Sequence, residues 1–291
     1  IGKVKEIHAW TNRPIWPQGF STPPEQEAVP LGIDWEQWVG PAPWVDYSPR
    51  IAPFAWRGWW NYGTGALGDM ACHIMDLGYW SMQPENGPAL APQAVTAQQN
   101  GATEYSPPIN SMITWDFGPS QYAAKEGFQF FWYDGYIDAE FDRQNWQLAK
   151  NGNEYNHPSE EVLEGVDFSK YGSVIVGEEG KLFFNRSRNN WVLKTSSQID
   201  GFDWPEITLP RARDQDNYKE WFDAVEGKIP QGESNFELAG PMTETILLGV
   251  LAQRKPDTRL EWDAESMQIK GHPELQSQIR REYRKNWTLT A

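Results

Sequence analysis

With 291 residues, the chain is long enough to bury a substantial core as one large domain or two ordinary ones. Its net charge of -15, from 25 basic and 40 acidic residues with no Lys/Arg-rich run, disfavours a nucleic-acid partner. The longest apolar run, Ile246–Ala252, is far short of the roughly 20 residues of a membrane span, so no membrane-spanning helix is expected. The single cysteine, Cys72, excludes a disulfide bond within the chain.

The first predicted element is a β-strand within Ile1–Asn12, where apolar residues alternate around Val4, Ile7 and Trp10. Residues 12–62 follow as a loop rich in Trp and Pro, with one short helix near Asp34–Val39. Loops this long are often functional. Their Trp rings either stack on sugar rings or fill a core under the loop, and for any single Trp we favour the core.

A helix from about Gly65 to Met82 comes next. Its apolar residues at helical spacing are Leu67, Met70, Ile74, Leu77 and Trp80. Beyond Pro92 the pattern predicts strands at Gln93–Gln99, Ser111–Phe117, Gly127–Tyr133, Ser173–Val176, Lys181–Asn185, Trp191–Thr195 and Leu260–Asp263, with a hairpin turn at Gly177–Gly180. Late helices are predicted from a cap at Asp214 to Gly227, over Glu237–Arg254 and after Pro273.

The order of these elements indicates the fold class. Successive strands without intervening helices favour a largely antiparallel sheet with helices gathered on one face, an α+β fold rather than a doubly wound one. No repeat or low-complexity linker divides the chain, so we expect a single domain over residues 1–291.

The segment GTGALG, Gly63 to Gly68, matches the G-x-G-x-x-G pattern of dinucleotide-binding loops. That site also needs a hydrophobic strand before the glycines and a second strand that ends in an acidic residue. Here the preceding residues are the aromatic run WRGWWNY, and the predicted helix leads into the loop QPENGPALAP. We therefore interpret the glycines as positions at the start of a helix where the missing side chains let backbone or a ligand approach closely.

Asp69 and His73 lie four residues apart on this helix and so share a face. A carboxylate beside an imidazole can orient the ring for general acid–base chemistry or proton relay. The alternatives are a surface ion pair or a metal site, and the latter would need another ligand that the sequence does not indicate. We therefore predict no metal site. The other histidines, His8, His157 and His272, are expected to be structural or solvated.

Several segments together resemble the C-terminal domain of the Gfo/Idh/MocA family of NAD(P)-dependent oxidoreductases. They are IGKV, HAWTNRPIWPQG, DWEQWVGPAP, WRGWWNYGTGALGDMACHIMD, VGEEG and EYRKNW, and the glycine-rich helix start leading into D-x-x-x-H is the most specific. The resemblance implies an open-faced, mainly antiparallel sheet with helices behind it. It also implies that a Rossmann domain upstream of Ile1 binds NAD or NADP, which would explain a start without Met and leaves no cofactor-binding residue in this chain.

The same resemblance implies catalytic roles. His73 matches the family's proton-transfer histidine, and Asp69 matches the acidic residue beside the reacting hydroxyls of a sugar or polyol. Substrate contacts are expected from Thr11 and Arg13 at the end of the first strand, and from three residues near the mouth of the site. These three are Trp16, Arg57 and Trp60.

The resemblance also bears on partners and location. It implies a homo-oligomer formed through the sheet face, and it favours the bacterial periplasm over the cytoplasm. The main hypothesis is the substrate-binding half of a sugar or polyol dehydrogenase, inactive when separated from its nucleotide-binding domain. The alternatives are a stand-alone carbohydrate-binding module, a structural subunit, and an enzyme that uses NAD transiently to cleave a glycosidic bond.

Overall fold

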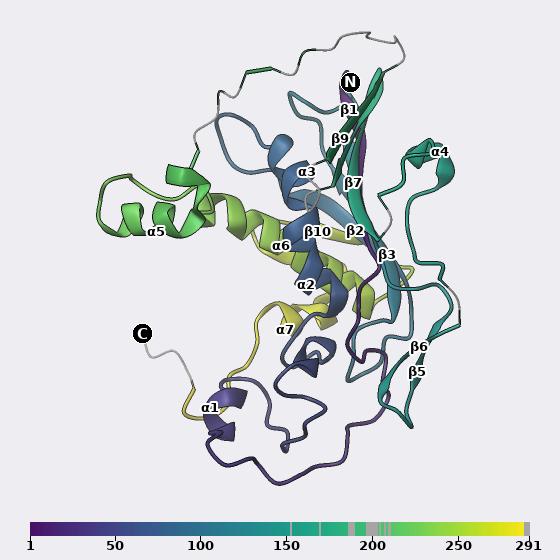
Figure 1. Ribbon diagram of the computed structural model, residues 1–291, viewed down its shortest axis with the longest axis vertical. Coiled ribbons are helices and arrows are strands. Elements are labelled where there is room, and N and C mark those ends of the chain that lie inside the picture. The colour runs from purple at the N-terminus through teal and green to yellow at the C-terminus, as the bar shows by residue number, and fades with distance from the viewer. Residues whose placement is uncertain are drawn as a thin grey trace.

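A large open sheet forms the centre of the molecule (Figure 1). The computed structural model describes residues 1–151, 153–168, 170–185, 190–195, 203, 205–206, 208 and 211–287. Within these residues, nine strands pair in the order β11-β10-β2-β3-β4-β1-β7-β8-β9. They are β1 Val4–Thr11, β2 Pro92–Asn100, β3 Asn110–Phe117, β4 Phe128–Asp134, β7 Tyr171–Gly177, β8 Gly180–Asn185, β9 Asn190–Thr195, β10 Leu260–Asp263 and β11 Gln268–Lys270.

The sheet is mainly antiparallel, as predicted. In its described part, the pairing of β1 with β4 is parallel and the other strand pairs are antiparallel. The predicted hairpin is confirmed, because β7 and β8 pair across the turn between Gly177 and Gly180. A parallel neighbour of the first strand requires a long crossover, and here β1 is followed by the loop, the helices and two other strands before β4.

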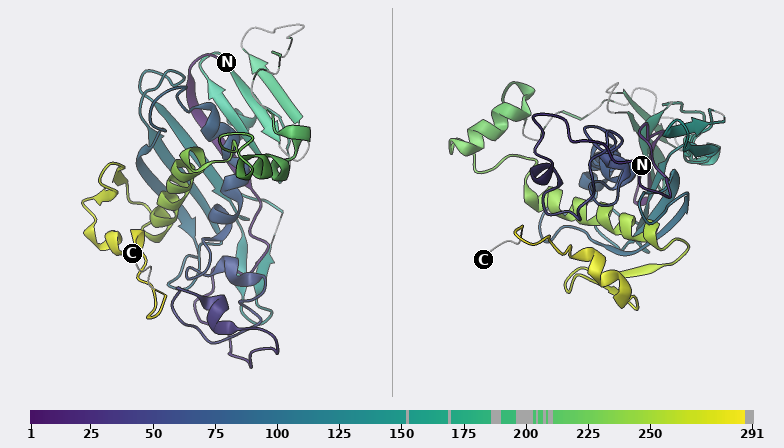
Figure 2. Two further views of the ribbon diagram at one scale, coloured as in Figure 1. Left: turned by 90° about the vertical axis from the view of Figure 1, so that its left-hand side faces the viewer. Right: turned by 90° about the horizontal axis from the view of Figure 1, so that it is seen from below.

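Three helices cover one face of this sheet, with bounds α2 Gly65–Ile74, α3 Asp76–Ser81 and α6 Phe236–Arg254. Helix α6 crosses the sheet over β2 and β3, while α2 contacts β1, β4 and α6 (Figure 2). The shorter helices are α1 Trp35–Val39, η1 Ala55–Gly58, α4 Glu160–Leu163, η3 Arg213–Gln215, α5 Asn217–Val225, η4 Pro273–Leu275 and α7 Gln276–Ile279.

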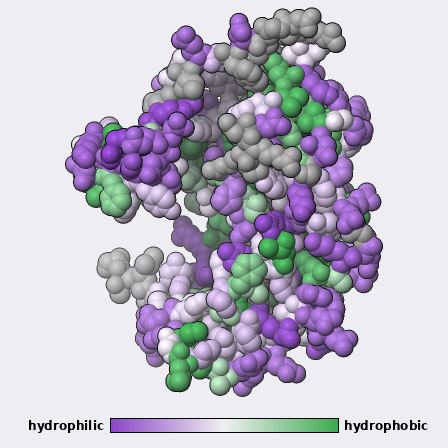
Figure 3. Space-filling view, in the orientation of Figure 1, coloured by the Kyte–Doolittle hydropathy of each residue, from purple (hydrophilic) through white to green (hydrophobic). Residues whose placement is uncertain are grey.

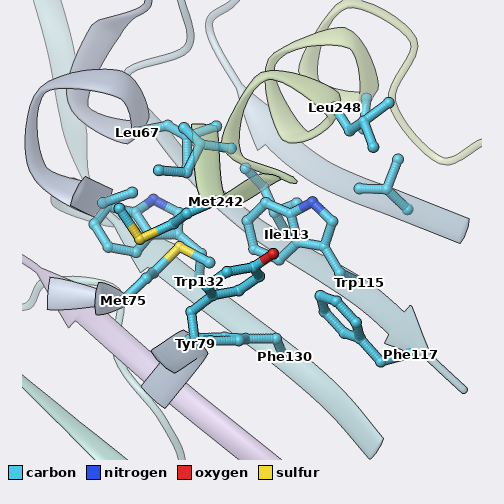
Figure 4. Close-up of a cluster of buried hydrophobic side chains, with 14 of the residues drawn as sticks. Leu67, Met75, Tyr79, Ile113, Trp115, Phe117, Phe130, Trp132, Met242 and Leu248 are labelled. Carbon is cyan, nitrogen blue, oxygen red and sulfur yellow. The ribbon is translucent and has the colours of Figure 1, made fainter. Parts of the chain in front are cut away.

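The main core lies between these helices and the sheet (Figure 4). The alternation of side chains along a strand directs apolar residues into this core. In β3 every second residue is buried, and Ile113 and Trp115 face the helices. Gly249 lets α6 approach closely, since a Cβ there would lie 2.5 Å from the ring of Trp115. The segment predicted as one helix from about Gly65 to Met82 forms two helices, α2 and α3, which are divided at Met75.

The apolar face predicted for this helical segment was partly wrong. The fully buried side chains recur at every fourth residue as Leu67, Ala71, Met75 and Tyr79. Trp80, which was placed on that face, is 42% exposed instead. Tyr79, the residue before Trp80, occupies the core position instead (Figure 4).

The Trp-rich loop over residues 12–62 builds a second core. Its buried aromatic side chains include Phe20, Trp35 and Trp59. They are joined by Trp146 from a hairpin that the sequence analysis missed, β5 Ala139–Asp142 and β6 Gln147–Lys150. The interpretation that most of these Trp rings fill a core is confirmed for Trp35 and Trp59.

The opposite face of the sheet is partly covered. Trp10, Val174 and Phe183 of this face pack under Phe168, near α4. On the remaining part, His8 is buried against Phe131 with ring centroids 4.6 Å apart and is hydrogen-bonded to the Tyr133 hydroxyl at 3.1 Å. His8 is therefore structural, as expected.

The predicted cap of helix α5 was wrong. Asp216, not Asp214, caps this helix, because its carboxylate accepts hydrogen bonds from the backbone N–H groups of Tyr218 and Lys219. A cap residue needs an extended backbone. Asp216 has one, at φ -114 and ψ 110, whereas Asp214 is left-handed at φ 57. Helix α5 projects from the body, and Figure 3 shows the surface hollowed beneath it.

Candidate active site

A cavity of about 340 Å³ lies at the start of α2. Its wall combines residues from three parts of the chain. Trp56 and Arg57 come from η1, the segment from Trp60 to Asp69 supplies the start of α2, and Arg281 follows α7. The cavity thus brings the glycine segment together with residues from both the Trp-rich loop and the C-terminal part of the chain.

The structure explains the glycines of this segment by packing within the chain. A Cβ on Gly63 would lie 2.7 Å from the carbonyl oxygen of Arg57, and one on Gly65 would lie 2.6 Å from Pro107. Gly65 also has φ +66, which favours glycine. The element before the segment is the 3₁₀ helix η1 rather than a strand. The segment therefore lacks the preceding strand of a dinucleotide-binding loop, in agreement with the sequence analysis.

Arg57 and Asp69 form an ion pair at the cavity wall. Arg57 Nε donates to Asp69 Oδ1 at 2.9 Å, and both side chains are 27% exposed. The guanidinium is held further by the Phe54 carbonyl oxygen at 3.1 Å and by the Trp56 ring, whose centroid is 4.6 Å away. Asp69 Oδ1 is thereby fixed, and no bond from the described residues is recorded for Oδ2.

The expected contact between Asp69 and His73 is absent in this part of the structure. Asp69 bonds to Arg57 instead, because a guanidinium is always charged and offers a rigid set of donors. His73 lies one turn further along α2, is exposed, and does not line the cavity. Among the described residues it has no hydrogen bond or ion pair, so its predicted proton-transfer role stays a prediction.

The structure separates the five predicted substrate contacts. Arg57 and Trp60 line the cavity. Trp16 is buried, and its ring centroid lies 5.8 Å from the guanidinium of Arg57. Its Nε1–H donates a hydrogen bond to Gln18 Oε1. Thr11 is fully buried and Arg13 is half-buried, and neither lines the cavity.

Tyr62, Arg254 and Arg281 belong to this region, and sequence reasoning missed them. Tyr62 lines the cavity, and burial raises the pKa of its hydroxyl to about 12. The Arg254 guanidinium lies over the Trp60 ring, 4.3 Å from its centroid. Burial, followed by the nearby charge of Arg281, lowers the pKa of Arg254. No motif marked Arg281, although EYRKNW nearby was part of the resemblance.

The C-terminal segment that carries Arg281 is fastened to helix α1. Arg284 donates to both carboxylate oxygens of Glu36, at 2.8 and 3.2 Å, and to the Gly40 carbonyl oxygen. Trp287 Nε1 adds a bond to Glu36 at 3.2 Å. The hydrogen bonds from Arg284 lower the pKa of Glu36 most, and the bond from Trp287 lowers it further. Figure 1 shows the segment after α7 running down beside α1.

Two further features of the described residues concern metal binding and membranes. In the described ranges, no group of three or more His, Cys, Asp or Glu side chains could hold a metal ion. None of the helices found there is long and apolar enough to cross a bilayer. A second cavity of about 560 Å³, between the start of β1 and the end of α3, contains none of the predicted site residues.

Comparison with known proteins supports the resemblance for the first third of the chain. Residues 4–104 match the model described as "Oxidoreductase family, C-terminal alpha/beta domain" of the Gfo/Idh/MocA type. The match spans β1, the Trp-rich loop, α2 and α3, and it confirms the predicted resemblance to this C-terminal domain over that segment. It includes the whole glycine segment and both Asp69 and His73.

Solved structures give only distant similarity. A levoglucosan dehydrogenase in complex with NADH and L-sorbose is 16% identical with a TM-score of 0.44, over 90% of this chain and 59% of that one. An NAD binding oxidoreductase from Klebsiella pneumoniae is 14% identical with a TM-score of 0.41, over 90% and 59%. An inositol dehydrogenase homolog from Azotobacter vinelandii, complexed with NADH and myo-inositol, is 12% identical with a TM-score of 0.38, over 90% and 57%. The chain thus spans less than two thirds of each. No curated protein sequence matches it.

Proposed function

We propose that this chain is the substrate-binding and proton-transfer half of an NAD(P)-dependent oxidoreductase that acts on a hydroxyl of a sugar or polyol. The observation that carries the proposal is the cavity at the start of α2. There the Arg57–Asp69 pair meets the aromatic side chains of Trp56, Trp60 and Tyr62, within the segment that the family model matches. Flat aromatic faces beside a fixed carboxylate suit a sugar ring and its hydroxyls.

Each residue has a role in this proposal. Asp69, held by Arg57 through one oxygen, accepts a hydrogen bond from a substrate hydroxyl at the other oxygen. His73, one turn along the same helix face, takes the hydroxyl proton, because an alkoxide is a far better hydride donor than an alcohol. The exposure of His73 leaves it free to meet a substrate held against another domain.

NAD or NADP would be held by a separate nucleotide-binding domain. The glycine segment of this chain follows the 3₁₀ helix η1 rather than a strand, and its glycines allow close packing against Arg57 and Pro107. The bound nicotinamide would supply the hydride acceptor. This chain alone is therefore expected to be inactive.

The test is an assay of the protein joined to its nucleotide-binding domain, with NAD and NADP and a panel of sugars and polyols. Sugar-dependent formation of NADH or NADPH that Arg57→Gln reduces supports the proposal. Tight monosaccharide binding by the 291-residue chain alone, without any redox activity of the joined protein, would favour a carbohydrate-binding module. Cleavage of an aryl glycoside at constant NADH would favour the bond-cleaving alternative.

We further propose that the protein self-associates through the sheet face opposite α2 and α6. Partly buried apolar side chains remain on that face, among them Met112, Phe131 and Val176. Light scattering after size exclusion tests this proposal. An oligomer that Val176→Asp dissociates supports it, and a monomer at all accessible concentrations contradicts it.

A further inference from the structure

We infer that the cavity at the start of α2 selects sugars that carry a carboxylate, and that Arg281 binds this group. The inference names the substrate class of the site described above, and it rests on the proposed function only for the reaction that follows binding.

The charges at the cavity are unequal. Arg57 is neutralised by Asp69 at 2.9 Å. Arg281 also lines the cavity, and no carboxylate of the described residues pairs with it. Its neighbour along the C-terminal segment, Arg284, is paired with Glu36. The exposed side chain of Arg281 therefore lines the cavity without a counter-ion from the part of the chain that the structure describes.

Arg254 adds a second positive charge. Its guanidinium lies over the ring of Trp60, which lines the cavity, although Arg254 itself does not. Arg254 too lacks a carboxylate partner among the described residues. Burial lowers the pKa of Arg254, and the charge of Arg281 lowers it further. In a chain with 40 acidic side chains, two such arginines without counter-ions indicate a place for an external anion.

The size and walls of the cavity favour a sugar acid over a larger anion. The volume of about 340 Å³ is near the lower end of the roughly 300–1,000 Å³ of small-molecule sites, so it suits one sugar ring rather than a dinucleotide. The planar guanidinium of Arg281 matches a planar carboxylate with two parallel hydrogen bonds. Trp56 and Trp60 offer faces for the ring of the same ligand.

The experiment is a calorimetric titration of the joined protein with matched pairs of sugars, D-glucuronate against D-glucose and D-galacturonate against D-galactose, with D-glucose 6-phosphate and NAD titrated separately. The account predicts that at least one acid binds about tenfold or more tightly than its neutral partner, as charge-assisted hydrogen bonds do. Arg281→Gln should remove this preference and leave the affinity for the neutral sugar within about twofold. Arg281→Lys, which keeps the charge, should weaken the preference for the acid less than Arg281→Gln does.

The matched control is Arg280→Gln, which removes an exposed charge next to Arg281 that does not line the cavity. It is expected to leave all affinities unchanged. Equal binding of acids and neutral sugars by the wild type overturns the inference, as does a preference for the phosphate. An Arg281→Gln variant that weakens NAD alone also overturns it, because the anion would then be the cofactor. If the titration shows a preference for the carboxylate but the activity assay of the joined protein shows no NAD reduction, the inference stands and the oxidoreductase proposal is refuted.

Discussion

Arg57 Nε lies 2.9 Å from Asp69 Oδ1, and this ion pair joins η1 to helix α2 at the wall of the cavity. Both side chains keep 27% of their surface exposed, so solvent screens the pair. Pairs of this kind contribute about 1 kcal/mol or less to stability. The pair therefore positions a carboxylate for a ligand more than it holds the fold.

Asp69→Asn tests this reading of the pair. The variant keeps the size of the side chain but loses the charge that accepts a substrate hydroxyl. We expect a fall of about 10- to 100-fold in kcat/KM for the sugar, while the free energy of unfolding changes by less than about 1 kcal/mol. Kinetics of the joined protein and urea denaturation measure the two quantities. Asp46→Asn, outside the cavity, is the control. An Asp69→Asn variant that is folded but strongly destabilised, with kcat/KM unchanged, would refute this role of the pair.

Gly63→Ala tests whether the glycine segment serves packing. The added Cβ would lie 2.7 Å from the carbonyl oxygen and 2.8 Å from the Cα of Arg57, so backbone must shift. Overpacking of this kind costs about 1–3 kcal/mol, and the shift also displaces Arg57 from Asp69. Thermal or urea denaturation should show the loss of stability. A calorimetric titration should show the weaker sugar binding. Gly232→Ala, whose Cβ would be 3.5 Å from its nearest neighbour, should change stability by less than about 1 kcal/mol. Equal effects of both changes would contradict the packing account.

Asp134 predicts a pH dependence of stability. It is fully buried at the end of β4, where it accepts bonds from Ser111 Oγ and Trp132 Nε1, and burial raises its pKa to about 7. The folded pKa is above the unfolded value of 3.8, so the folded state holds the proton more tightly. The resulting stabilisation is complete below about pH 4 and is lost as pH rises through about 7.

The comparison with Asp134→Asn isolates this contribution. Urea denaturation between pH 4 and 8 should show that the wild type loses free energy of unfolding relative to the variant as pH rises, by up to about 4 kcal/mol at about 1.4 kcal/mol per pKa unit. The difference should level off above about pH 7. A difference that stays constant over this range would mean that Asp134 is ionised throughout.

Arg284→Ala tests whether the C-terminal segment is held by α1. The change removes the bonds to Glu36 and Gly40 that fasten this segment. We expect faster amide exchange in residues 280–287 and weaker binding of sugar acids, since Arg281 lies on the same segment. Hydrogen exchange followed by mass spectrometry measures the first effect. Lys285→Ala removes a neighbouring exposed charge and should have neither effect.

Much of the sheet was predictable because its strands alternate buried and exposed residues, as β3 does. The hairpin of β5 and β6 was not. Its short strands carry no continuous apolar alternation, and Trp146 is buried only because the Trp-rich loop lies against it. The parallel pairing of β1 with β4 was equally hidden, since it depends on which strands the crossover brings together.

The site was predicted in part. Helical spacing correctly placed Asp69 and His73 on one helix. Arg57 and Trp60 line the same cavity as Asp69, and their contact with substrate stays a prediction. Spacing could not show that Asp69 pairs with Arg57 rather than His73, because that depends on how η1 folds back onto α2. Arg281 comes from a distant segment and reaches the cavity only through the packing of the C-terminal segment. Arg254, the last residue of α6, does not line the cavity but contacts the Trp60 ring of its wall.

The central claim is that α2 carries the proton-transfer residue of an oxidoreductase, and His73→Ala tests it most directly. The joined protein and this variant should be assayed for sugar-dependent NAD reduction and, separately, for sugar binding by calorimetry. His272→Ala, which removes a histidine outside the cavity, is the control. The account predicts that His73→Ala lowers kcat by about 10²- to 10⁴-fold with sugar affinity unchanged, the range of general acid–base catalysis. An active wild type whose His73→Ala variant is equally active would contradict it, and so would a wild type that binds sugars but never reduces NAD.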